Sequence, residues 1–382
     1  MRILHTADWH VGRSIRGRSR APEHRAVLQE LLDACERESC DLVIVSGDLF
    51  ENSVPSPEAE EIVYATLLGF VERQARVALI AGNHDNPLRL RAVAPLLKRA
   101  GAILSGTHLA RPGDGGLVQV ETRAGETARI ALFPFLPKTQ LFRSSDLMKA
   151  GAADLTQTYR QAYAQMVSVF TPHFAAETVN LATAHVMVDQ AERAGGERDV
   201  HSIFDYSVPA SIFNSPRLQY VALGHVHKCQ PVPAGCPAWY PGSPLQLEFG
   251  DPDLEKHFLL IEVEAGLPAE VRQLAHKAGR RLRRVQGKLA TLEQAGELYA
   301  DDYLQVVLEE APRPGLARLV REALPNAIDI RIAETAPGEL EVNPMPEGPP
   351  EKLFEEFLRE KGRLDDKLLT LFRELLEEVH ET

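Results

Sequence analysis

Residues 42–48 read LVIVSGD, and this short stretch decides how the first part of the chain is expected to fold. Four consecutive apolar residues form a compact strand that is suited to burial inside a sheet. Gly47 and Asp48 follow the strand directly. Ligand sites in α/β proteins collect outside the carboxyl ends of the strands, so we expect Asp48 to belong to such a site.

The sequence around this strand alternates between strands and helices. The first helix has a proline in its first turn, Pro22, and carries an apolar stripe along one face. This rhythm predicts a layered α/β fold. The expected elements of the first hundred residues are strands at 2–6, 42–45 and 77–81 and helices at 22–38, 57–73 and 87–99.

The later sequence indicates three further parts. Strands are expected at 128–133, 179–184, 218–223 and 257–263, with a helix at 155–176; a small α+β unit follows, with strands at 303–308 and 328–332 around a helix at 315–323. A stretch with five prolines and two glycines predicts a linker, and the charged amphipathic sequence beyond it predicts two helices that separate at Gly362. We therefore divide the chain into a main domain at 1–278, a small domain at 279–335, a linker at 336–350 and a helical pair at 351–382.

The composition is that of an ordinary globular protein. Of the 382 residues, 44% are hydrophobic and 25% are charged. No apolar run approaches the roughly 20 residues that cross a membrane, and the N-terminal residues turn polar too soon for a signal peptide. We therefore expect a cytoplasmic protein with reduced cysteines. A net charge of −12 argues against a protein that coats nucleic acid, but acidic metal ligands become locally positive once metals bind.

Five polar motifs each follow directly after an expected strand. Because the ligand sites of α/β proteins lie at the carboxyl ends of strands, these motifs are expected to converge although they are far apart in the sequence. The glycines that precede three of them permit tight turns and close backbone approach. The motifs are Asp8-Trp9-His10, Gly47-Asp48, Gly82-Asn83-His84-Asp85, His185 and Gly224-His225-Val226-His227.

The residue types in these motifs indicate a metal centre. Aspartate, asparagine and histidine together suit first-row divalent ions such as Mn²⁺, rather than a cysteine-rich zinc site or an all-oxygen calcium site. The set is too large for one ion that also binds substrate, and it suits two ions that share a bridging carboxylate. One histidine after a strand is more often structural, but five motifs in this placement argue against that interpretation. The predicted ligands are Asp8, His10, Asp48, Asn83, His185, His225 and His227.

These motifs resemble those of the calcineurin-like metallophosphoesterases. The segments MRILHTADWHVGRSIRGRSR at 1–20, VIVSGDLFENSVPSPEA at 43–59 and ALGHVHKCQ at 222–230 further resemble the SbcD family of bacterial nuclease subunits, which pair with SbcC ATPases. The resemblance extends over the whole chain. It implies a four-layer αββα sandwich with a capping domain beside it. It also implies 3′→5′ exonuclease and endonuclease action on DNA ends and hairpins in repair and recombination.

The resemblance also implies a role for each residue of the centre. One metal would be bound by Asp8, His10, Asp48 and His227, and the other by Asp48, Asn83, His185 and His225, with Asp48 bridging. His84 would stabilise the transition state or protonate the leaving oxygen, and Asp85 would orient the His84 ring. Several archaeal relatives have a histidine where this chain has Glu51, so a second catalytic imidazole is not expected there.

Two basic stretches are candidates for a DNA path, with a solvated charged surface as the alternative. The candidates are Arg13, Arg16, Arg18 and Arg20 after the first motif, and Arg280, Arg281, Arg283, Arg284 and Lys288 at the entry to the small domain. The resembling family also commonly forms homodimers. The candidate contacts lie at 58–71 and 88–97 and include Val63, Leu67, Phe70, Val93 and Leu96, with burial in the chain's own core as the alternative.

The C-terminal helices are expected to bind a partner, because their apolar stripes lie on a tethered element. In the resembling family this segment binds the SbcC coiled coil; packing on the chain's own domain is the alternative. The candidate contacts are Leu353, Phe354, Phe357, Leu368, Phe372, Leu375 and Leu376.

Two other functions stay open at this point. One is a metallophosphoesterase that acts on phosphoproteins or cyclic nucleotides, and the other is a scaffold that has lost catalysis and only binds DNA ends.

Overall fold

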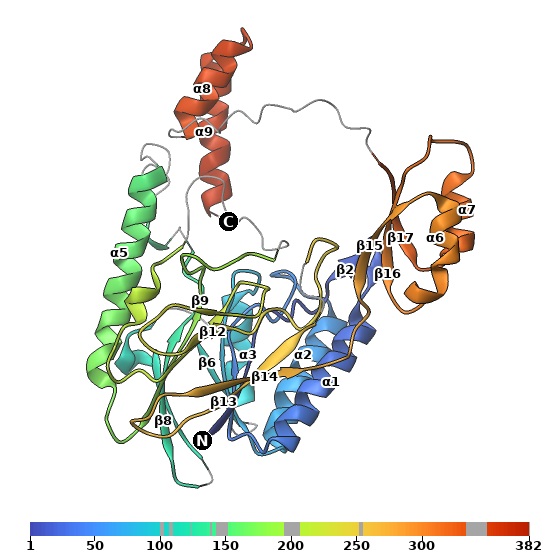
Figure 1. Ribbon diagram of the computed structural model, residues 1–382. Coiled ribbons are helices and arrows are strands. Elements are labelled where there is room, and N and C mark those ends of the chain that lie inside the picture. Colours follow the sequence, from blue (N-terminus) through green and yellow to red (C-terminus); the bar gives the residue numbers. More distant parts are fainter. Residues whose placement is uncertain are drawn as a thin grey trace.

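The main body of the chain consists of two sheets packed face to face, with helices on both outer sides (Figure 1). The computed structural model describes residues 1–99, 103–106, 110–122, 124–137, 140–142, 152–194, 207–251, 255–333 and 350–381. The linker predicted at 336–350 therefore lies almost entirely outside the described residues.

The first sheet contains the strand from which the sequence argument started. Its central strands run parallel, and two antiparallel strands extend one edge. In order, the strands are β14 (Glu270–Ala275), β13 (His257–Glu262), β1 (Arg2–Thr6), β4 (Leu42–Val45), β5 (Arg76–Ile80) and β6 (Ile103–Gly106). The helices that connect the parallel strands are α1 (Ala21–Arg37), α2 (Pro57–Glu72) and α3 (Pro87–Arg99).

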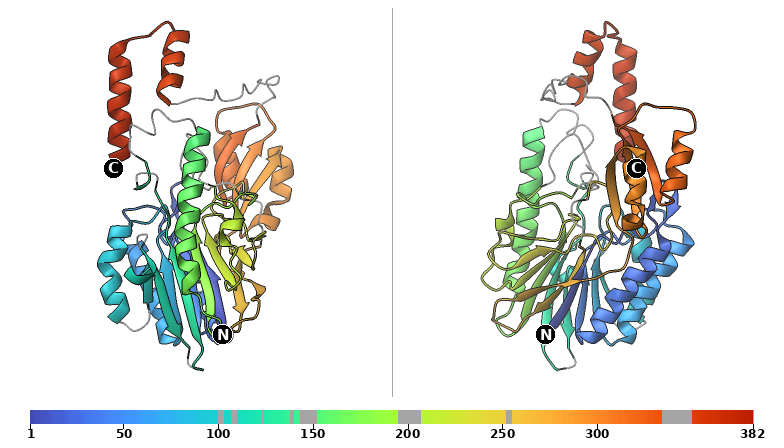
Figure 2. Two further views of the ribbon diagram at one scale, coloured as in Figure 1. Left: turned by 90° about the vertical axis from the view of Figure 1, so that its left-hand side faces the viewer. Right: turned by 45° about the vertical axis from the view of Figure 1, so that its right-hand side comes forward.

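The second sheet is built in the same way from the middle of the chain. Four neighbouring strands run parallel, and one antiparallel strand lies at each edge. In order, the strands are β11 (Gln230–Val232), β12 (Ala238–Tyr240), β10 (Tyr220–Gly224), β9 (Val179–His185), β8 (Thr127–Phe133) and β7 (Leu117–Glu121). Helix α5 (Ala152–Phe170) covers its outer face (Figure 2).

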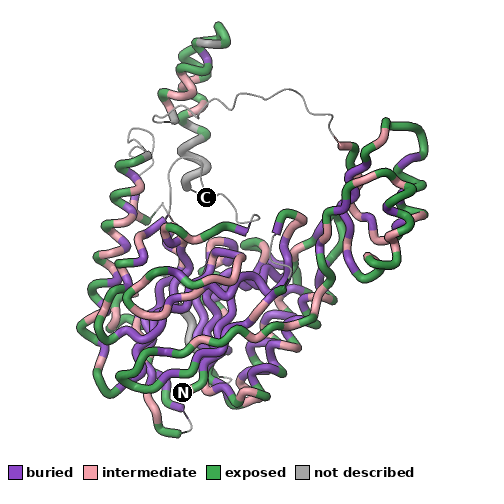
Figure 3. The backbone as a smooth tube through the Cα atoms, viewed as in Figure 1, coloured by how far each residue is buried: buried purple, intermediate pink, exposed green. Residues whose placement is uncertain are grey.

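Alternation along the strands produces the layers. In β4, Val43 and Val45 pack under the helices of the first sheet, whereas Leu42 and Ile44 pack between the two sheets. Both faces of the strand are therefore buried, and the most deeply buried backbone runs through the middle of the body (Figure 3). The expectation of a four-layer αββα sandwich is confirmed by this arrangement.

The small unit near the C-terminal end has its own core. Its sheet consists of three parallel strands, of which the first, at the basic stretch, was not expected from the sequence. The strands are β15 (Leu282–Gly287), β16 (Tyr303–Leu308) and β17 (Ala327–Ile332), and the helices are α6 (Leu289–Gln294) and α7 (Leu316–Ala323). A short hairpin, β2 (Ser14–Ile15) and β3 (Arg18–Ser19), reaches this unit from the main body, where Arg16 pairs with Asp329 at 2.9 Å.

The chain ends in two helices, α8 (Pro350–Glu360) and α9 (Asp366–Glu381), which stand apart from the main body in Figure 1. Gly362 ends the first helix in the left-handed conformation, with φ of 64°. Asp365 caps the second, accepting a hydrogen bond from the Lys367 N–H at 2.8 Å. Phe354 and Phe372 stack 4.1 Å apart between the helices, and other apolar side chains stay exposed. None of the helices in the described ranges is both long and apolar enough to cross a membrane.

Three residues predicted to contact a second copy belong to the core instead. Val63, Leu67 and Phe70 on α2 are fully buried, because this face of the helix packs against α1 and the first sheet. Leu96 on α3 is 70% exposed, and the neighbouring Leu88 is 63% exposed. Any contact with a second copy would therefore be made by α3 rather than by this face of α2.

The two sheets approach each other closely at their carboxyl ends. A Cβ atom placed on Gly224, at the end of β10, would lie 1.9 Å from the backbone oxygen of Ser46, just after β4. The φ of Gly224 is not in the left-handed region, so the constraint on this residue is space and not backbone conformation.

Gly224→Ala is therefore expected to lower the free energy of unfolding by at least about 1–3 kcal/mol, because an oversized group at a packed position forces the backbone apart. Gly113→Ala is the matched control, since a Cβ atom there meets no other atom within 4 Å. Denaturant unfolding of both variants measures the difference. Equal stability of the two variants would show that the sheets can move apart without cost.

Candidate metal centre

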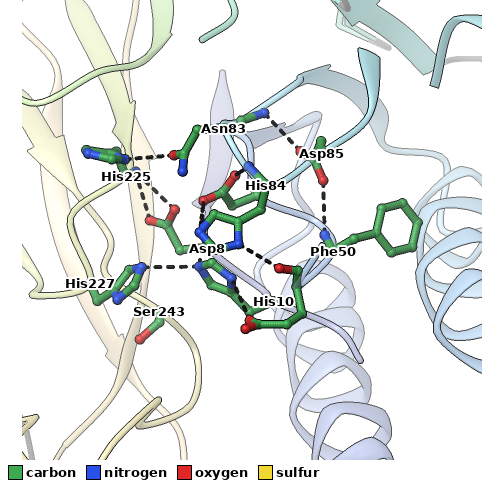
Figure 4. Close-up of polar contacts among 12 residues, drawn as sticks. Asp8, His10, Phe50, Asn83, His84, Asp85, His225, His227 and Ser243 are labelled. Carbon is green, nitrogen blue, oxygen red and sulfur yellow. Dashed lines mark hydrogen bonds and ion pairs between the residues drawn. The ribbon is translucent and has the colours of Figure 1, made fainter. Parts of the chain in front are cut away.

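The five motifs meet where the carboxyl ends of the two sheets come together (Figure 4). Those of the first sheet follow β1, β4 and β5, and those of the second follow or end β9 and β10. Most of the polar side chains of the centre are buried, among them Asp8, His10 and His185, which are fully inaccessible to solvent. Segments distant in sequence thus build one water-poor polar centre.

Four residues of the centre adopt left-handed backbone conformations. The φ angles are 53° at Asp8, 48° at His10, 52° at Asp48 and 103° at His225. Such conformations cost about 1–3 kcal/mol each and cluster at functional sites. Backbone hydrogen bonds hold two of them in place, from the N–H of Asp8 to Gly47 at 3.0 Å and from the N–H of His10 to Asp48 at 3.1 Å.

One half of the centre contains Asp8, His10 and His227. The Nε2 atoms of His10 and His227 face each other at 3.2 Å. The Asp8 carboxylate accepts hydrogen bonds from the His225 N–H at 3.0 and 3.1 Å. Ligand atoms of these three side chains all lie within 4.8 Å of one another, which is close enough to share one ion.

The other half contains Asp48, Asn83, His185 and His225. The Asn83 Oδ1 lies 2.9 Å from both His185 Nε2 and His225 Nδ1. The His185 Nδ1 lies 2.8 Å from the backbone oxygen of Ser46 and so carries a proton. Its Nε2 faces Asn83 Oδ1 and lies 3.5 Å from Asp48 Oδ2, the two oxygens with which it would share a cation.

These donor atoms fit a pair of metal ions. In both halves, nitrogen and oxygen atoms that carry lone pairs face one another, as at His10 and His227. Buried groups of this kind need a proton or a cation for compensation. A histidine that donates its second ring nitrogen to a backbone carbonyl, as His185 does, has the arrangement of a metal ligand.

The charges within the centre support this interpretation. Burial and the nearby Asp48 raise the pKa of Asp8 above its usual range. Burial opposes protonation of His185, but the two carboxylates outweigh it and raise the pKa of that ring to about 9. Without metals the centre therefore holds protons, and cations would displace them on binding.

His84 lies beside these residues and is oriented by the backbone. Its Nδ1 lies 2.6 Å from the carbonyl oxygen of Glu51, so this nitrogen donates, and Nε2 faces the centre 4.0 Å from Asp48 Oδ2. The Glu51 carbonyl thus orients the ring, a role that the resemblance had assigned to Asp85. The Asp85 carboxylate instead accepts hydrogen bonds from the backbone N–H groups of Leu49, Phe50 and Gly82 at 2.9–3.3 Å, which ties two loops together.

Glu51 has a role that the sequence did not reveal. Its Oε2 lies 3.2 Å from His10 Nδ1, so the carboxylate fixes this ring with Nε2 toward the centre. Arg13 binds the other carboxylate oxygen at 3.0 Å. Burial opposes ionisation of Glu51, but His10 and Arg13 lower its pKa to about 2. In the sequence, the only indication of this role was the position of Glu51, three residues after Asp48.

The predicted DNA path along the first basic stretch needs correction. Arg20 is only 1% exposed, and its guanidinium donates to Glu23 and to the backbone oxygens of Gln246 and Arg280. It therefore anchors the entry to the small domain and cannot reach DNA. Arg13 is likewise occupied by Glu51 and by the carbonyl of Leu247.

The other predicted arginines lie at or near the surface. Arg16 pairs with Asp329, and Arg18 lies over the ring of Tyr303 at 5.9 Å. Arg283 pairs with Asp302 at 2.5 Å. Arg281 and Arg284 are exposed on and beside β15. The structure thus separates these residues into two anchors, Arg13 and Arg20, and five arginines at or near the surface.

Comparison with known proteins identifies the fold family. The sequence model of the calcineurin-like phosphoesterases matches residues 1–229, and that of the type 5 capsule protein repressor C-terminal domain matches residues 278–362. The SbcD subunit of nuclease SbcCD from Rhodobacter capsulatus is 35% identical over 70% of this chain and 67% of its own length.

Two further relatives carry the same description. The SbcD protein of Bacillus subtilis is 32% identical over 74% of this chain and 71% of its own length. That of Escherichia coli K12 is 26% identical over 79% of this chain and 74% of its own length. With its phosphoesterase motifs placed at the seam of an αββα sandwich, the chain belongs to the calcineurin-like phosphoesterases and, within them, to the SbcD family of nuclease subunits.

Proposed function

We propose that this chain hydrolyses phosphodiester bonds of DNA at duplex ends and hairpins, with two divalent cations, most suitably Mn²⁺. The observation that carries the proposal is the buried cluster of facing nitrogen and oxygen atoms, with His10 Nε2 3.2 Å from His227 Nε2 and Asn83 Oδ1 2.9 Å from His185 Nε2. Mixed nitrogen and oxygen donors of this kind suit Mn²⁺.

The grouping of side chains supports two ions. One would be held by Asp8, His10, Asp48 and His227, and the other by Asp48, Asn83, His185 and His225. Asp48 suits the bridging role because His10 Nε2 and His185 Nε2 lie on either side of its Oδ2, at 3.6 and 3.5 Å. Asp8 also lies within reach of both groups.

Hydrolysis needs an activated water, neutralised phosphate charge and a proton for the leaving oxygen. Two bound ions would activate the water by lowering its pKa, and they would offset the negative charge on the phosphate. His84 can supply the third, since its Nδ1 is fixed by the Glu51 carbonyl and its Nε2 points into the centre. The attacking water would release a proton to solvent, and its oxygen would bond to phosphorus as the bond between phosphorus and the 3′-oxygen breaks. His84, as an imidazolium, would pass its Nε2 proton to the departing 3′-oxygen.

The exposed arginines offer contacts to the DNA backbone. Arg16 and Arg18 project from the β2–β3 hairpin, which directly follows His10 in the chain, and Arg281 and Arg284 lie on the adjoining small unit. Contacts of this kind position the phosphate backbone and read no sequence. We therefore propose a path from the centre along the hairpin to β15.

The C-terminal helices suit a protein partner. Their exposed apolar side chains include Phe357, Leu368, Leu371 and Leu375, at 39–51% exposure. We propose that this surface, with Leu353, Phe354 and Phe372 beside it, binds an SbcC-type coiled-coil ATPase. The predicted contact Leu376 lies outside the described side chains. We also propose a homodimer through α3, where Leu88 and Leu96 are exposed, and a cytoplasmic setting that keeps the four free cysteines reduced.

The first prediction tests the activity itself. With Mn²⁺, the full chain is expected to shorten end-labelled duplex DNA and to open hairpins, and Asp48→Ala is expected to lose both ions and nearly all cleavage. Gel analysis and elemental analysis measure the two effects. Faster turnover of a phosphoprotein or a cyclic nucleotide than of DNA would assign the centre to another substrate, and a chain that binds metals but cleaves nothing would be a scaffold.

The second prediction separates proton transfer from metal binding. His84→Gln is expected to keep two bound ions and DNA affinity while turnover falls by about 10²–10⁴-fold, because a positioned general acid contributes that much. The surface variant His173→Gln serves as the control. Loss of an ion from His84→Gln would make His84 a metal ligand, consistent with its position near His10 and Asp48.

The third prediction concerns the partner. Deletion of residues 351–382 is expected to abolish co-purification with the ATPase and ATP stimulation of cleavage, because the proposed binding surface is removed. Metal content and weak Mn²⁺-dependent cleavage by the truncated chain should persist. If the deletion instead unfolds the main domain while the ATPase still associates, the helices belong to the core of this chain.

A further inference from the structure

Four polar side chains lie between the two sheets, directly below the metal centre. They are His5 on β1, Ser46 after β4, Thr183 on β9 and Tyr220 on β10, and none is more than 1% exposed. They lie against an apolar cluster between the sheets, which includes Ile44. We call these four residues the inter-sheet polar chain.

The four side chains of the inter-sheet polar chain are joined by short contacts. Tyr220 Oη lies 2.8 Å from His5 Nδ1, and His5 Nε2 lies 3.0 Å from Ser46 Oγ. Ser46 Oγ lies in turn 2.9 Å from Thr183 Oγ1 and donates to the backbone oxygen of Ala222 at 3.3 Å. A neutral imidazole donates through one nitrogen and accepts through the other, so His5 can connect both hydroxyl groups. Burial favours this neutral form and lowers the pKa of His5 to about 3.

The inter-sheet polar chain is connected to the metal centre through the backbone of Ser46. Its carbonyl oxygen accepts the hydrogen bond from His185 Nδ1 at 2.8 Å, which directs His185 Nε2 toward Asp48 and Asn83. Gly224 on the second sheet leaves room for this oxygen, because a Cβ atom there would come within 1.9 Å of it. The position of the carbonyl therefore depends on how Ser46 is held between the sheets.

An apolar interface would hold two sheets together without the free-energy cost of burying polar groups. Polar groups in a buried layer destabilise it unless every one is paired, and fully paired networks make a structure rigid and specific. The contacts cross from β1 and the end of β4 to β9 and β10. They thus fix the register of one sheet against the other at the level of the centre.

We propose that His5, Ser46 and Tyr220 are positioning residues, which hold the Ser46 carbonyl and thereby the His185 ring in the orientation that binds metal. This inference rests on the proposed function, since it assigns His185 as a metal ligand. It explains why the most buried polar side chains below the centre are connected to His185 and not only to one another.

The test compares Tyr220→Phe and Ser46→Ala with Tyr163→Phe in the full chain. Tyr163 is a fully buried tyrosine in the outer core of the second sheet, so its substitution is the same chemical change away from the centre. Calorimetric titration with Mn²⁺ should show one of the two sites weakened by about 10–100-fold in Ser46→Ala and by about 10-fold in Tyr220→Phe. The other site and both sites of Tyr163→Phe should change by less than about 2-fold on the same scale.

Two more measurements separate positioning from simple loss of stability. In proteins loaded with the diamagnetic ion Zn²⁺, ¹⁵N-histidine NMR should show one Nδ1–H signal for His185 in the native protein and in Tyr163→Phe, but more than one ring environment in Ser46→Ala. A double variant that combines Ser46→Ala with Tyr220→Phe should bind Mn²⁺ no more weakly than Ser46→Ala alone. The effects of two substitutions are not additive when the residues act as one unit.

The inference is overturned if Ser46→Ala and Tyr220→Phe bind both ions as tightly as the native chain and only melt at a lower temperature. If Ser46→Ala does not fold, Tyr220→Phe decides the matter, since it removes a single hydroxyl group. A native chain that binds fewer than two Mn²⁺ ions contradicts the proposed function instead, whatever the variants do.

Discussion

The close approach of the two sheets at Ser46 and Gly224 is the constraint on which the rest of the structure depends. Only a glycine fits at the end of β10, because the backbone oxygen of Ser46 occupies the space of a side chain. This contact brings the carboxyl ends of both sheets to one place. Side chains more than one hundred residues apart in the sequence then come together, as Asn83 Oδ1 and His185 Nε2 do at 2.9 Å across 102 residues.

The frame around this contact is apolar and large enough to hold a strained centre. Left-handed conformations at Asp8, His10 and Asp48 and the facing ring nitrogens of His10 and His227 all oppose folding. Three buried hydrophobic layers, one between the sheets and one under each set of helices, supply the opposing stabilisation. The centre thus keeps a geometry that its own residues would not adopt in isolation.

The sequence predicted those parts of the structure that depend on short stretches of chain. The run at 42–45 is a strand buried on both faces, and its polar successor Asp48 lies at the strand end, as the α/β rule requires. Contacts between distant segments were not predictable in this way. From the sequence, Arg20 is expected at the surface. It is buried instead, because its guanidinium donates to backbone oxygens 226 and 260 residues further along the chain. Glu51 and the orientation of His84 likewise depend on how two loops pack after folding.

The acidic character of the chain and its action on a polyanion are compatible because of where the charges lie. Asp8 and Asp48 are buried at the centre and Glu51 is half-buried beside His10, so histidines and bound cations would compensate these carboxylates and DNA would not meet them as free charge. The exposed arginines Arg281 and Arg284 lie instead on the small unit. The net charge of the whole chain therefore does not predict the charge that DNA meets at the protein surface. The carboxylates at the centre would be neutralised by the same ions that take part in the chemistry.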